Sequence, residues 1–324
     1  MKLKLSTNSW PIRGSFTISR GSKTQVDVIV VELEQNGIIG RGECVPYGRY
    51  NESIESVLAE LESIQASVES GVNQKEIQSL LPSGAARNAL DCAYWDLKCK
   101  SKGISIWDSL SITPEPLVTA YTLSLDTPEN MEQAAIENAH RPLLKLKLGG
   151  KEDLDRVKAV RRGAPDSDII LDANEAWDAN IYQALIPELV KLGVSMIEQP
   201  FPADKDDVLL KLPRPIPICA DESCHDRKSL AQIIDRYEMI NIKIDKTGGL
   251  TEALALKQEA EQAGLQVMVG CMLASSLSMA PAFVVAQGAQ IVDLDGPLLL
   301  SQDIKHGFKF EQNRMLPFTP ALWG

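Results

Sequence analysis

The chain has 324 residues, 44% of them hydrophobic, with 44 acidic against 33 basic side chains and a formal net charge of −11. A chain of this length buries a large core and exceeds the size at which one core usually stays single, so we expect a large domain beside a smaller one. The negative charge, without a run of lysine or arginine, argues against nucleic acid and anionic membranes as partners and favours a soluble enzyme.

The first hundred residues predict a small α+β module. Residues 2–10, 24–35 and 38–45 alternate apolar and polar side chains, and Asn36-Gly37 between the last two runs is a strong hairpin signal. Two helical stretches follow. The second is the clearer one, because apolar residues recur at helical spacing between Ser83-Gly84 and Gly103.

From Val118 onward, apolar strands alternate regularly with amphipathic helices. We expect strands near residues 118–122, 143–148, 168–172, 195–198, 217–221, 239–244, 266–270 and 291–294. Eight nearly continuous apolar strands are typical of a parallel αβ barrel covered on both sides. The last thirty residues lack a final long helix, so the eighth repeat is incomplete and we expect the tail to return to the first module.

The cysteines and the apolar stretches indicate the compartment. Six cysteines are scattered without a CxxC spacing in a chain too long to need disulfides, so we interpret them as reduced thiols. The first residues, MKLKLSTNSW, contain no apolar run of signal-peptide length, and no 18-residue apolar stretch occurs in the chain. We therefore expect neither export nor membrane insertion, and a cytoplasmic location.

Charged residues occupy the ends of successive predicted strands. They are Lys147, Asp172, Glu198, Asp221 and Lys243, spaced by 25, 26, 23 and 22 residues. All strands of a parallel barrel open on the same face at their C-terminal ends, so these side chains should converge on one cavity. One such charge alone would most often be a surface residue, but the joint pattern predicts a functional site.

The three carboxylates predict a metal site. Asp172, Glu198 and Asp221 are hard oxygen ligands without a nearby cysteine or histidine, which is the donor set that Mg²⁺ or Mn²⁺ prefers. Zinc is disfavoured, because the three histidines of the chain are not spaced as a pair.

The lysines predict acid–base chemistry. Lysine inside an apolar strand, as in LLKLKLG and INIKIDK, is costly unless it faces a polar cavity or is neutral. Lys145 shares the face of Lys147, since strand side chains alternate with a period of two. Two ammonium groups so close disfavour each other's charge, so we expect one of them to act as a base near neutral pH.

Together these residues resemble a known family. The KxK of Lys145 and Lys147, the three carboxylates and the lysine of NIKIDKTGG resemble the muconate-lactonizing branch of the enolase superfamily. IVDLDGP and GECVPYGRY resemble the dipeptide epimerases of that branch, and AARNALDCAYWDL, CADESCH, DKTGGLTEALAL and GCML are similar to the L-Ala-D/L-Glu epimerases. The resemblance runs nearly end to end.

The resemblance implies a fold and a cofactor. The fold would be α/β, a modified (β/α)7β TIM barrel of residues 113–299 under an α+β capping domain of residues 1–112, to which the tail 300–324 belongs. Mg²⁺ would be held by Asp172, Glu198 and Asp221, with Mn²⁺ as the alternative.

The resemblance also frames the reaction that we infer. Loss of a proton from the carbon beside a carboxylate gives a dianionic enediolate, which fixed positive charge stabilises. Strands two and six lie on opposite sides of an eight-stranded barrel, so Lys147 and Lys243 should face opposite faces of this planar species. One removes the proton and the other returns it, a 1,1-proton transfer that inverts the centre. Lys145 should lower the pKa of Lys147.

Further residues are candidates for binding the substrate. In dipeptide epimerases, the pair that corresponds to Asp293 and Asp295 binds the free α-ammonium group of the substrate. A cation should meet the side chain of a glutamate, and the segment ISRGSK offers Arg20 and Lys23 without deciding between them. The remaining candidates are Cys271 and Met272 as pocket residues, and Asn174, Glu222 and Asn241 as supports of the proposed ligands or base.

Several functions stay open from sequence. The first is an isomerase, a Mg²⁺-dependent epimerase of dipeptides such as L-Ala-L-Glu and L-Ala-D-Glu, which would serve the recycling of murein peptides. The second is an o-succinylbenzoate synthase or a cycloisomerase of the same branch, although their substrates carry no ammonium for the two aspartates. The third is a metal-free Schiff-base lyase using Lys243, which leaves three carboxylates unexplained. Homo-oligomers are common among such barrels, so a homo-oligomer is a further expectation to be tested.

Overall fold

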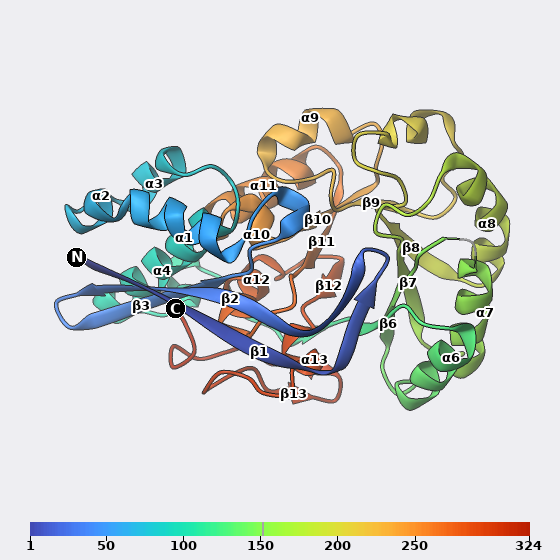
Figure 1. Cartoon of the computed structure of the whole chain (residues 1–324), viewed down its shortest axis with the longest axis horizontal. Coiled ribbons are helices and arrows are strands. Elements are labelled where there is room, and N and C mark those ends of the chain that lie inside the picture. Colours follow the sequence, from blue (N-terminus) through green and yellow to red (C-terminus); the bar gives the residue numbers. More distant parts are fainter. Residues whose placement is uncertain (151) are drawn as a thin grey trace.

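The computed structural model describes residues 1–150 and 152–324. It contains two principal sheets, an antiparallel one built from the first 44 residues and a parallel one of eight strands. Figure 1 shows the first sheet and its helices beside the parallel sheet, with the end of one long hairpin extending over it. Both termini lie on the side of the antiparallel sheet.

The antiparallel sheet confirms the predicted hairpin. It consists of β1 (Lys2–Ile18), β2 (Gly21–Gln35) and β3 (Ile38–Cys44) in that order. Asn36 and Gly37 both have positive φ, 54° and 78°, as the tight turn between β2 and β3 requires.

The first strand is much longer than the predicted 2–10. Pro11 and Gly14 interrupt the alternating pattern, which hid the continuation, but the strand absorbs them in an irregular stretch between Pro11 and Phe16 and then pairs again with β2. This second half carries the hairpin tip that reaches the mouth of the parallel sheet.

Five helices complete the first module, where the sequence predicted two helical stretches. They are α1 (Ile54–Ser63), α2 (Gln65–Glu69), α3 (Gln74–Leu80), α4 (Ala85–Lys102) and α5 (Ile106–Leu110). The α4 helix begins after Gly84 and ends at Gly103, whose φ of 63° is left-handed, as predicted. It lies directly on β3, because a Cβ atom at Gly40 or Gly42 would collide with the backbone of Ala93 or Ala89.

The parallel sheet forms the expected barrel. Its strands are β5 (Tyr121–Leu123), β6 (Leu143–Lys147), β7 (Asp168–Asp172), β8 (Val194–Glu198), β9 (Ile218–Ala220), β10 (Met239–Ile242), β11 (Gln266–Gly270) and β12 (Ile291–Asp293), hydrogen-bonded in sequence order. A hydrogen bond of 2.8 Å from Ala120 N to Val292 O joins the first and last strands. The fold is therefore a TIM-type barrel with a separate antiparallel module.

The predicted strand 118–122 is in fact two strands. β4 (Leu117–Val118) leaves the barrel and pairs with β14 (Arg314–Met315), which in turn pairs with β13 (Phe310–Glu311) in the C-terminal tail. Only β5 belongs to the barrel. The tail supplies a pairing partner that the local apolar pattern does not reveal.

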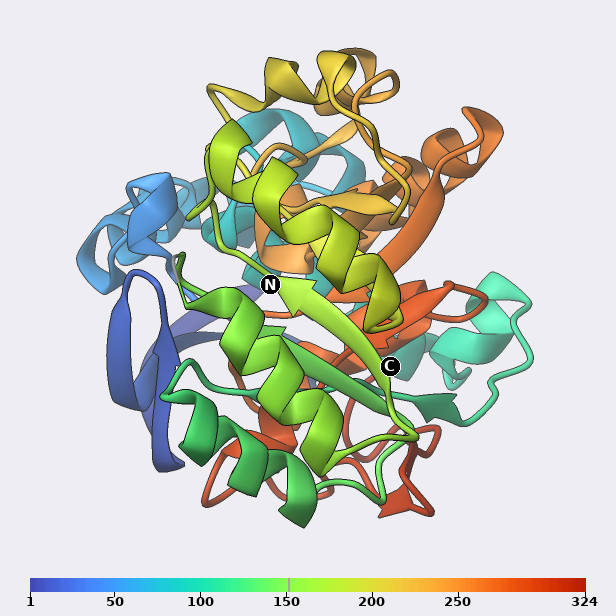
Figure 2. The same cartoon turned by 90° about the vertical axis from the view of Figure 1, so that its right-hand side faces the viewer.

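Helices follow the barrel strands along the chain. They are α6 (Pro128–Glu137), α7 (Asp153–Gly163), α8 (Ala179–Lys191), α9 (Leu230–Ile233), α10 (Ile244–Thr247), α11 (Leu250–Gln262), α12 (Ser276–Val285) and α13 (Gly296–Leu299). Figure 2 shows the green helices α6, α7 and α8 side by side on one outer face. The connection after β8 holds a 3₁₀ helix, Asp206–Lys211, instead of the expected α-helix, and the four-residue α13 is the predicted incomplete eighth repeat.

An apolar plug fills the barrel beneath its charged rim. It is formed by Ala120, Ile170, Met196, Cys219, Met239 and Met268, all buried. Ile170, Met196 and Cys219 each stand two residues before a predicted carboxylate ligand on the same strand. Because strand side chains alternate, those carboxylates project into the barrel one layer above the plug.

The tail returns to the first module, as predicted. Gly324 N donates to Asp96 Oδ1 of α4 at 2.7 Å, and Trp323 Nε1 donates to Arg41 O of β3 at 2.9 Å. The division into residues 1–112 with 300–324 and residues 113–299 stays a prediction.

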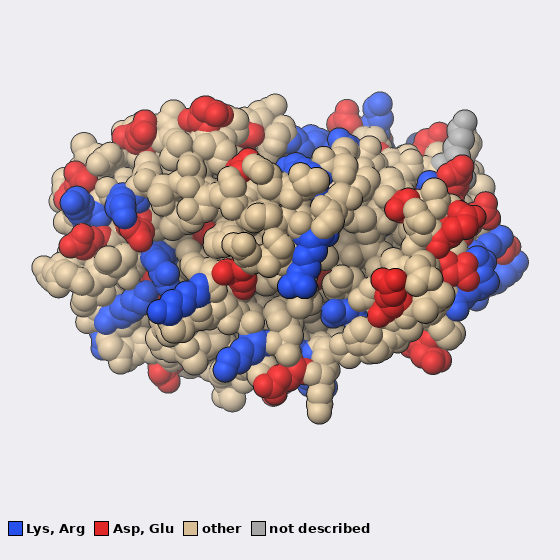
Figure 3. All heavy atoms as spheres, turned by 60° about the horizontal axis from the view of Figure 1, so that its bottom comes forward, with Lys and Arg blue, Asp and Glu red and all other residues tan. Residues whose placement is uncertain are grey.

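The remaining general features agree with the composition. All six cysteines are free thiols. No helix among the described residues is both long and apolar enough to span a bilayer. Figure 3 shows lysine and arginine interspersed with aspartate and glutamate on one face of the molecule.

Buried polar contacts join the first module to the barrel. Ser275, before α12, donates from its backbone N to Glu43 Oε1 at 2.9 Å, and its Oγ lies 2.8 Å from both oxygens of that carboxylate. Val45 N donates to Asp245 Oδ1 of α10 at 3.0 Å, and Asn88 Nδ2 donates to the same atom at 2.8 Å.

Glu43 gives the protein a pH-dependent stability. Burial raises its pKa from 4.5 to about 7. The folded protein therefore keeps this proton up to about pH 7, while the unfolded chain releases it near pH 4.5, so the free energy of unfolding falls as pH rises through this window. Glu43→Gln keeps the polar shape and should remove about 3 kcal/mol of that fall.

Urea unfolding of wild type and Glu43→Gln at several values between pH 5 and pH 8 measures this effect. The exposed Glu62→Gln on α1 is the matched control and should follow wild type. An identical pH slope in wild type and Glu43→Gln would refute the role of Glu43.

Candidate active site

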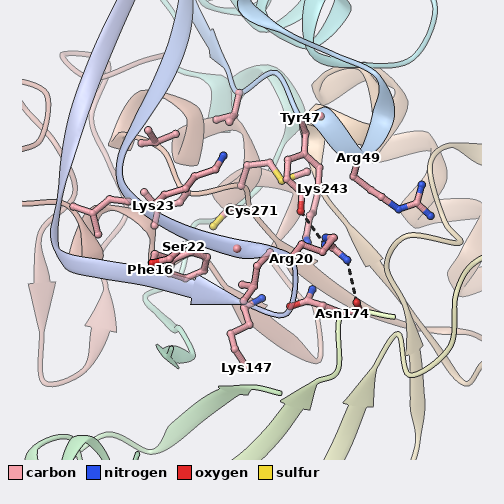
Figure 4. A pocket seen from close by; sticks show the side chains of 18 of the residues that line it. Phe16, Arg20, Ser22, Lys23, Tyr47, Arg49, Lys147, Asn174, Lys243 and Cys271 are labelled. Carbon is pink, nitrogen blue, oxygen red and sulfur yellow. Dashed lines mark hydrogen bonds between the residues drawn. The ribbon is translucent and has the colours of Figure 1, made fainter. Parts of the chain in front are cut away.

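A cavity of about 410 Å³ lies between the tip of the β1–β2 hairpin and the C-terminal ends of the barrel strands (Figure 4). Its hairpin side includes Phe16, Arg20 and Lys23, and its barrel side includes Lys147 and Lys243. This is the face on which the active sites of αβ barrels are built. The further predicted residues that line it are Asn174, Asp221, Cys271 and Met272.

The two predicted catalytic lysines face this one cavity from different strands. Lys147 ends β6, and its Nζ lies 2.6 Å from Asp172 Oδ2. Lys243 follows β10, and its Nζ lies 2.6 Å from Asp221 Oδ2. Both are less than a tenth exposed, so each ammonium is held by one carboxylate in a place from which water is largely excluded.

The three predicted metal ligands come from adjacent strand ends. Asp172 ends β7, Glu198 ends β8 and Asp221 directly follows β9, and all three are buried. Asn241 Nδ2 donates to Glu198 Oε1 at 2.6 Å, and the backbone N of Asn174 donates to Asp172 Oδ1 at 2.9 Å. Asn241 and Asn174 therefore orient carboxylates.

Lys145 lies beneath the cavity among carboxylates. Its Nζ is 2.6 Å from Glu198 Oε2, 2.7 Å from Asp293 Oδ2 and 3.3 Å from Asp172 Oδ2. Burial alone would lower the pKa of Lys145, but these carboxylates outweigh it and raise that pKa well above its usual value. The expectation that one of two close lysines acts as a base did not count these carboxylates, which keep Lys145 charged.

Burial and neighbouring charges also oppose each other in setting the pKa values of the other buried lysine and carboxylate groups. Burial would lower the pKa of Lys243, but Asp221 and Glu198 raise it. Burial would raise the pKa of Asp172, but Lys147 and Lys145 hold it low, and lysines likewise lower that of Asp221. For Glu198, burial and the nearby Asp172 charge prevail and raise the pKa. The site is thus a network of buried ion pairs.

The chemistry of the three carboxylates suits a hard divalent cation. They offer oxygen atoms from three neighbouring strands, which is the donor type that such an ion prefers. As the described side chains stand, no three carboxylate, imidazole or thiolate groups meet closely enough to hold an ion. Lysine ammonium groups lie between the carboxylates and pair with them instead.

Arg20 ties the hairpin tip to the barrel. Its guanidinium donates to Asn174 O at 3.0 Å and to Tyr47 Oη at 2.9 Å (Figure 4). It also donates to Glu222 Oε1 at 2.8 Å. Burial and the neighbouring Asp221 charge raise the pKa of Glu222 to about 8. Glu222 does not line the cavity, and it serves as the anchor of Arg20.

Lys23 differs from Arg20 in its contacts. It lines the cavity and pairs through its backbone with β1, but its ammonium forms no ion pair or hydrogen bond with the described residues. Cys271 and Met272 line the same cavity and follow β11, as the sequence predicted for pocket residues. A positive charge without a partner beside an apolar wall is suited to meet an acidic group of a ligand.

Asp293 and Asp295 lie deeper than expected. They are 4% exposed and do not line the cavity as it stands. Asp295 Oδ2 accepts from Thr122 N at 2.7 Å, and burial together with the Asp293 charge raises its pKa to about 7. Asp293 Oδ1 is buried and accepts no hydrogen bond from any described residue.

Three further residues at the site were not predicted. Tyr47 and Arg49 line the cavity from the segment GECVPYGRY, and Arg49 pairs with Glu175 at 2.8 Å. Lys246 is fully buried against Asp221. Its signal was visible, since it stands one helical turn after Lys243, but lysine at a helix start is ordinarily solvated.

Fold and site define the class of protein. A parallel barrel whose strand ends carry buried lysines and carboxylates, closed by an antiparallel module, is an enzyme built for acid–base chemistry. Residues 129–317 match the family described as enolase C-terminal domain-like, and residues 1–110 match the N-terminal domain of mandelate racemase and muconate lactonizing enzyme. The chain therefore belongs to the mandelate racemase and muconate lactonizing group of the enolase superfamily.

Its relatives are epimerases and racemases. The chain is 46% identical to the L-Ala-D/L-Glu epimerase of Escherichia coli strain K12, over 95% of this chain and 97% of the relative. It is 42% identical to an N-acetyl-D-glutamate racemase of a Pseudoalteromonas species, over 92% and 95% of the two chains. The chain is thus an isomerase of the racemase and epimerase class.

Solved structures of related proteins have the same fold. An enolase family member from Agrobacterium tumefaciens with homology to dipeptide epimerases, described with bound sodium and L-Ala-L-Glu, has a TM-score of 0.98 and 49% identity over 99% of each chain. A dipeptide epimerase from Methylococcus capsulatus, described with Mg and L-Arg-D-Lys, has a TM-score of 0.90 and 29% identity, over 100% of this chain and 99% of that one.

Proposed function

We propose that this chain is a Mg²⁺-dependent epimerase of L-Ala-L-Glu and L-Ala-D-Glu, inverting the α carbon of the C-terminal glutamate. The observation that carries this proposal is the placement of Lys147 and Lys243 on one cavity, each beside a buried carboxylate. A single base would suffice to remove a proton, whereas inversion uses a proton acceptor on one face of the reacting carbon and a proton donor on the opposite face.

The two lysines exchange roles with the direction of reaction. In one direction the neutral amine of Lys147 takes the α proton and the ammonium of Lys243 returns a proton to the opposite face. In the other direction the roles reverse. Inversion results because the two nitrogen atoms approach one planar enediolate carbon from opposite sides.

Asp172, Glu198 and Asp221 would hold the magnesium ion. When bound, such an ion supplies positive charge that stabilises the enediolate dianion and competes with the lysine ammonium groups for the carboxylates, which favours a neutral lysine. Asn241 and Asn174 keep Glu198 and Asp172 oriented. Lys145 remains charged and neutralises the carboxylates from below.

The ends of the dipeptide would meet opposite charges. Asp293 keeps one buried carboxylate oxygen without a hydrogen bond from the described residues, which suits the substrate ammonium. Arg20 is already paired with Glu222 and with Asn174 O, while Lys23 has no partner among the described residues. Lys23 is therefore the better candidate to bind the glutamate side chain.

Lys23→Met tests this assignment. It should lower kcat/KM for L-Ala-L-Glu about tenfold to a hundredfold, since a charge-assisted hydrogen bond is worth about 1.5–3 kcal/mol. The loss for L-Ala-L-Met, which lacks the side-chain carboxylate, should be small, and Lys23→Arg should retain selectivity. An equal loss on both dipeptides would refute the assignment, and would direct attention to Arg20.

Proton NMR in D₂O tests the function itself. L-Ala-L-Glu is incubated with enzyme and Mg²⁺, with and without EDTA, and the glutamate α-proton signal is followed. Metal-dependent loss of the signal with formation of L-Ala-D-Glu is the expected result. N-acetyl-L-glutamate is run in parallel, because a relative is named as an N-acetyl-D-glutamate racemase.

The other outcomes identify the alternatives. Exchange of N-acetylglutamate without exchange of the dipeptide would replace the dipeptide proposal. If neither substrate loses its signal, the o-succinylbenzoate synthase and cycloisomerase reactions are tested next. Borohydride trapping of a substrate carbonyl on Lys243 would identify a Schiff-base lyase.

The proposed biological role follows from the proposed substrate. L-Ala-D-Glu is a fragment of murein peptides, so we propose a role in their recycling, in the cytoplasm.

A further inference from the structure

Lys246 is a buried lysine outside the cavity that the proposed mechanism leaves without a role. It lies on the single-turn helix α10, and its side chain is completely buried. Its Nζ donates to Asp221 Oδ1 at 2.6 Å, to Asp221 O at 2.5 Å and to Asn241 O at 2.9 Å. An ammonium group has three donors, so all of its hydrogen-bonding capacity is used in these contacts.

Lys246 reaches Asp221 from behind the cavity. Asp221 and Lys243 line the active-site cavity, whereas Lys246 lines a neighbouring hollow of about 330 Å³ with Tyr50 and His225. Lys243 pairs with Oδ2 of Asp221 and Lys246 pairs with Oδ1. The two lysines thus hold the two oxygens of one carboxylate from its two sides.

Lys246 contacts the backbone at the point where the pairing of β9 with β10 ends. Ala220 and Ile240 are the last partners in the pairing of β9 and β10. The carbonyls of Asp221 and Asn241 come directly after, and both turn to Lys246 Nζ. A buried carbonyl without a hydrogen-bond donor is costly. The Lys246 ammonium therefore supplies the donors that the pairing of β9 and β10 no longer provides at the rim of the barrel.

The short helix that carries Lys246 is itself fastened to the first module. Asp245 accepts from Val45 N and Asn88 Nδ2, and Arg87 Nη2 donates to Thr247 O at 2.7 Å. Lys243 directly precedes the helix, and its carbonyl accepts from Lys246 N at 2.9 Å. Any displacement of Lys246 would therefore move both Lys243 and Asp221.

We propose that Lys246 is a positioning residue that fixes the Asp221 carboxylate, so that one oxygen is presented to the metal and Lys243 while the other is held from behind. This inference rests on the proposed function, because it assigns Asp221 to the metal. Lys246 acts through Asp221 and touches no substrate. Without it, the carboxylate is held through Oδ2 alone and three buried acceptors lose their donor.

The test measures metal binding apart from turnover. Lys246→Met, nearly isosteric but uncharged, is titrated with Mn²⁺ in the absence of substrate, and its kcat and KM for L-Ala-L-Glu are then measured at saturating Mg²⁺. We expect Mn²⁺ to bind about tenfold to a hundredfold more weakly and kcat to fall by a similar factor, as for other residues that orient metal ligands, with KM changing far less.

Lys257→Met is the matched control. Lys257 on α11 is partly buried and, like Lys246, donates to two carbonyls, Val285 O and Gln287 O, but it lies away from the cavity. The Lys257→Met variant should be less stable than wild type and should keep the wild-type affinity for Mn²⁺. If Lys246→Met does not fold, Lys246→Gln, which keeps two N–H donors and loses the charge, takes its place and should show the same direction of change.

Unchanged Mn²⁺ affinity and kcat in the Lys246 variant, with only a stability loss like that of Lys257→Met, would overturn the inference. Wild-type protein that does not bind Mn²⁺ would overturn it as well. Wild type that binds Mn²⁺ but does not epimerise the dipeptide contradicts the proposed function instead, and the titrations still decide the role of Lys246.

Discussion

Lys147→Ala and Lys243→Ala are each expected to lower the epimerisation rate about 10²- to 10⁴-fold, the usual contribution of a general acid or base. Each variant should still exchange the α proton of one epimer with D₂O, because the remaining lysine faces one side of the reacting carbon. The two variants should exchange opposite epimers. Proton NMR of L-Ala-L-Glu and L-Ala-D-Glu, each with each variant, measures both quantities.

The opposite selectivity of the two variants distinguishes two bases from one. A fold defect would lower the exchange of both epimers equally, and the exposed Lys228→Ala should behave as wild type. If both alanine variants exchange the same epimer, or if either keeps wild-type turnover, the two-base mechanism is wrong.

Removal of the metal or of one ligand should have an effect of similar size. EDTA treatment is expected to lower activity about 10³-fold, because a bound cation supplies several kcal/mol of transition-state stabilisation, and added Mg²⁺ should restore it. Glu198→Gln keeps the shape and an oxygen for Asn241, but it removes one charge from the cluster. It should weaken Mg²⁺ binding, lower kcat and leave the protein folded.

Calorimetric titration with Mg²⁺ and steady-state kinetics check this prediction, and Glu129→Gln, exposed at the start of α6, is the control. Full activity after EDTA, with no change on adding Mg²⁺, would contradict the metal-dependent mechanism. Wild-type affinity in Glu198→Gln would remove that carboxylate from the ligand set.

The sequence by itself determined the barrel and the composition of its rim. Lys147, Asp172 and Glu198 end their strands as predicted, and Asp221 and Lys243 directly follow theirs. This was predictable because the pattern is local: an apolar strand ends at a charged residue, and parallel strands open on one face. The hairpin turn at Asn36-Gly37 and the ends of α4 were predictable for the same reason.

The tertiary structure alone decided how these charges are paired. From the sequence, the two neighbouring lysines alone were expected to disfavour each other's charge, but carboxylates from three other strands surround Lys145 and raise its pKa. The partners of Arg20, the partnerless state of Lys23 among the described residues and the position of Lys246 behind Asp221 likewise depend on contacts between distant segments. Such contacts leave no local pattern, because the energy of a buried charge depends on every neighbour that the fold brings to it.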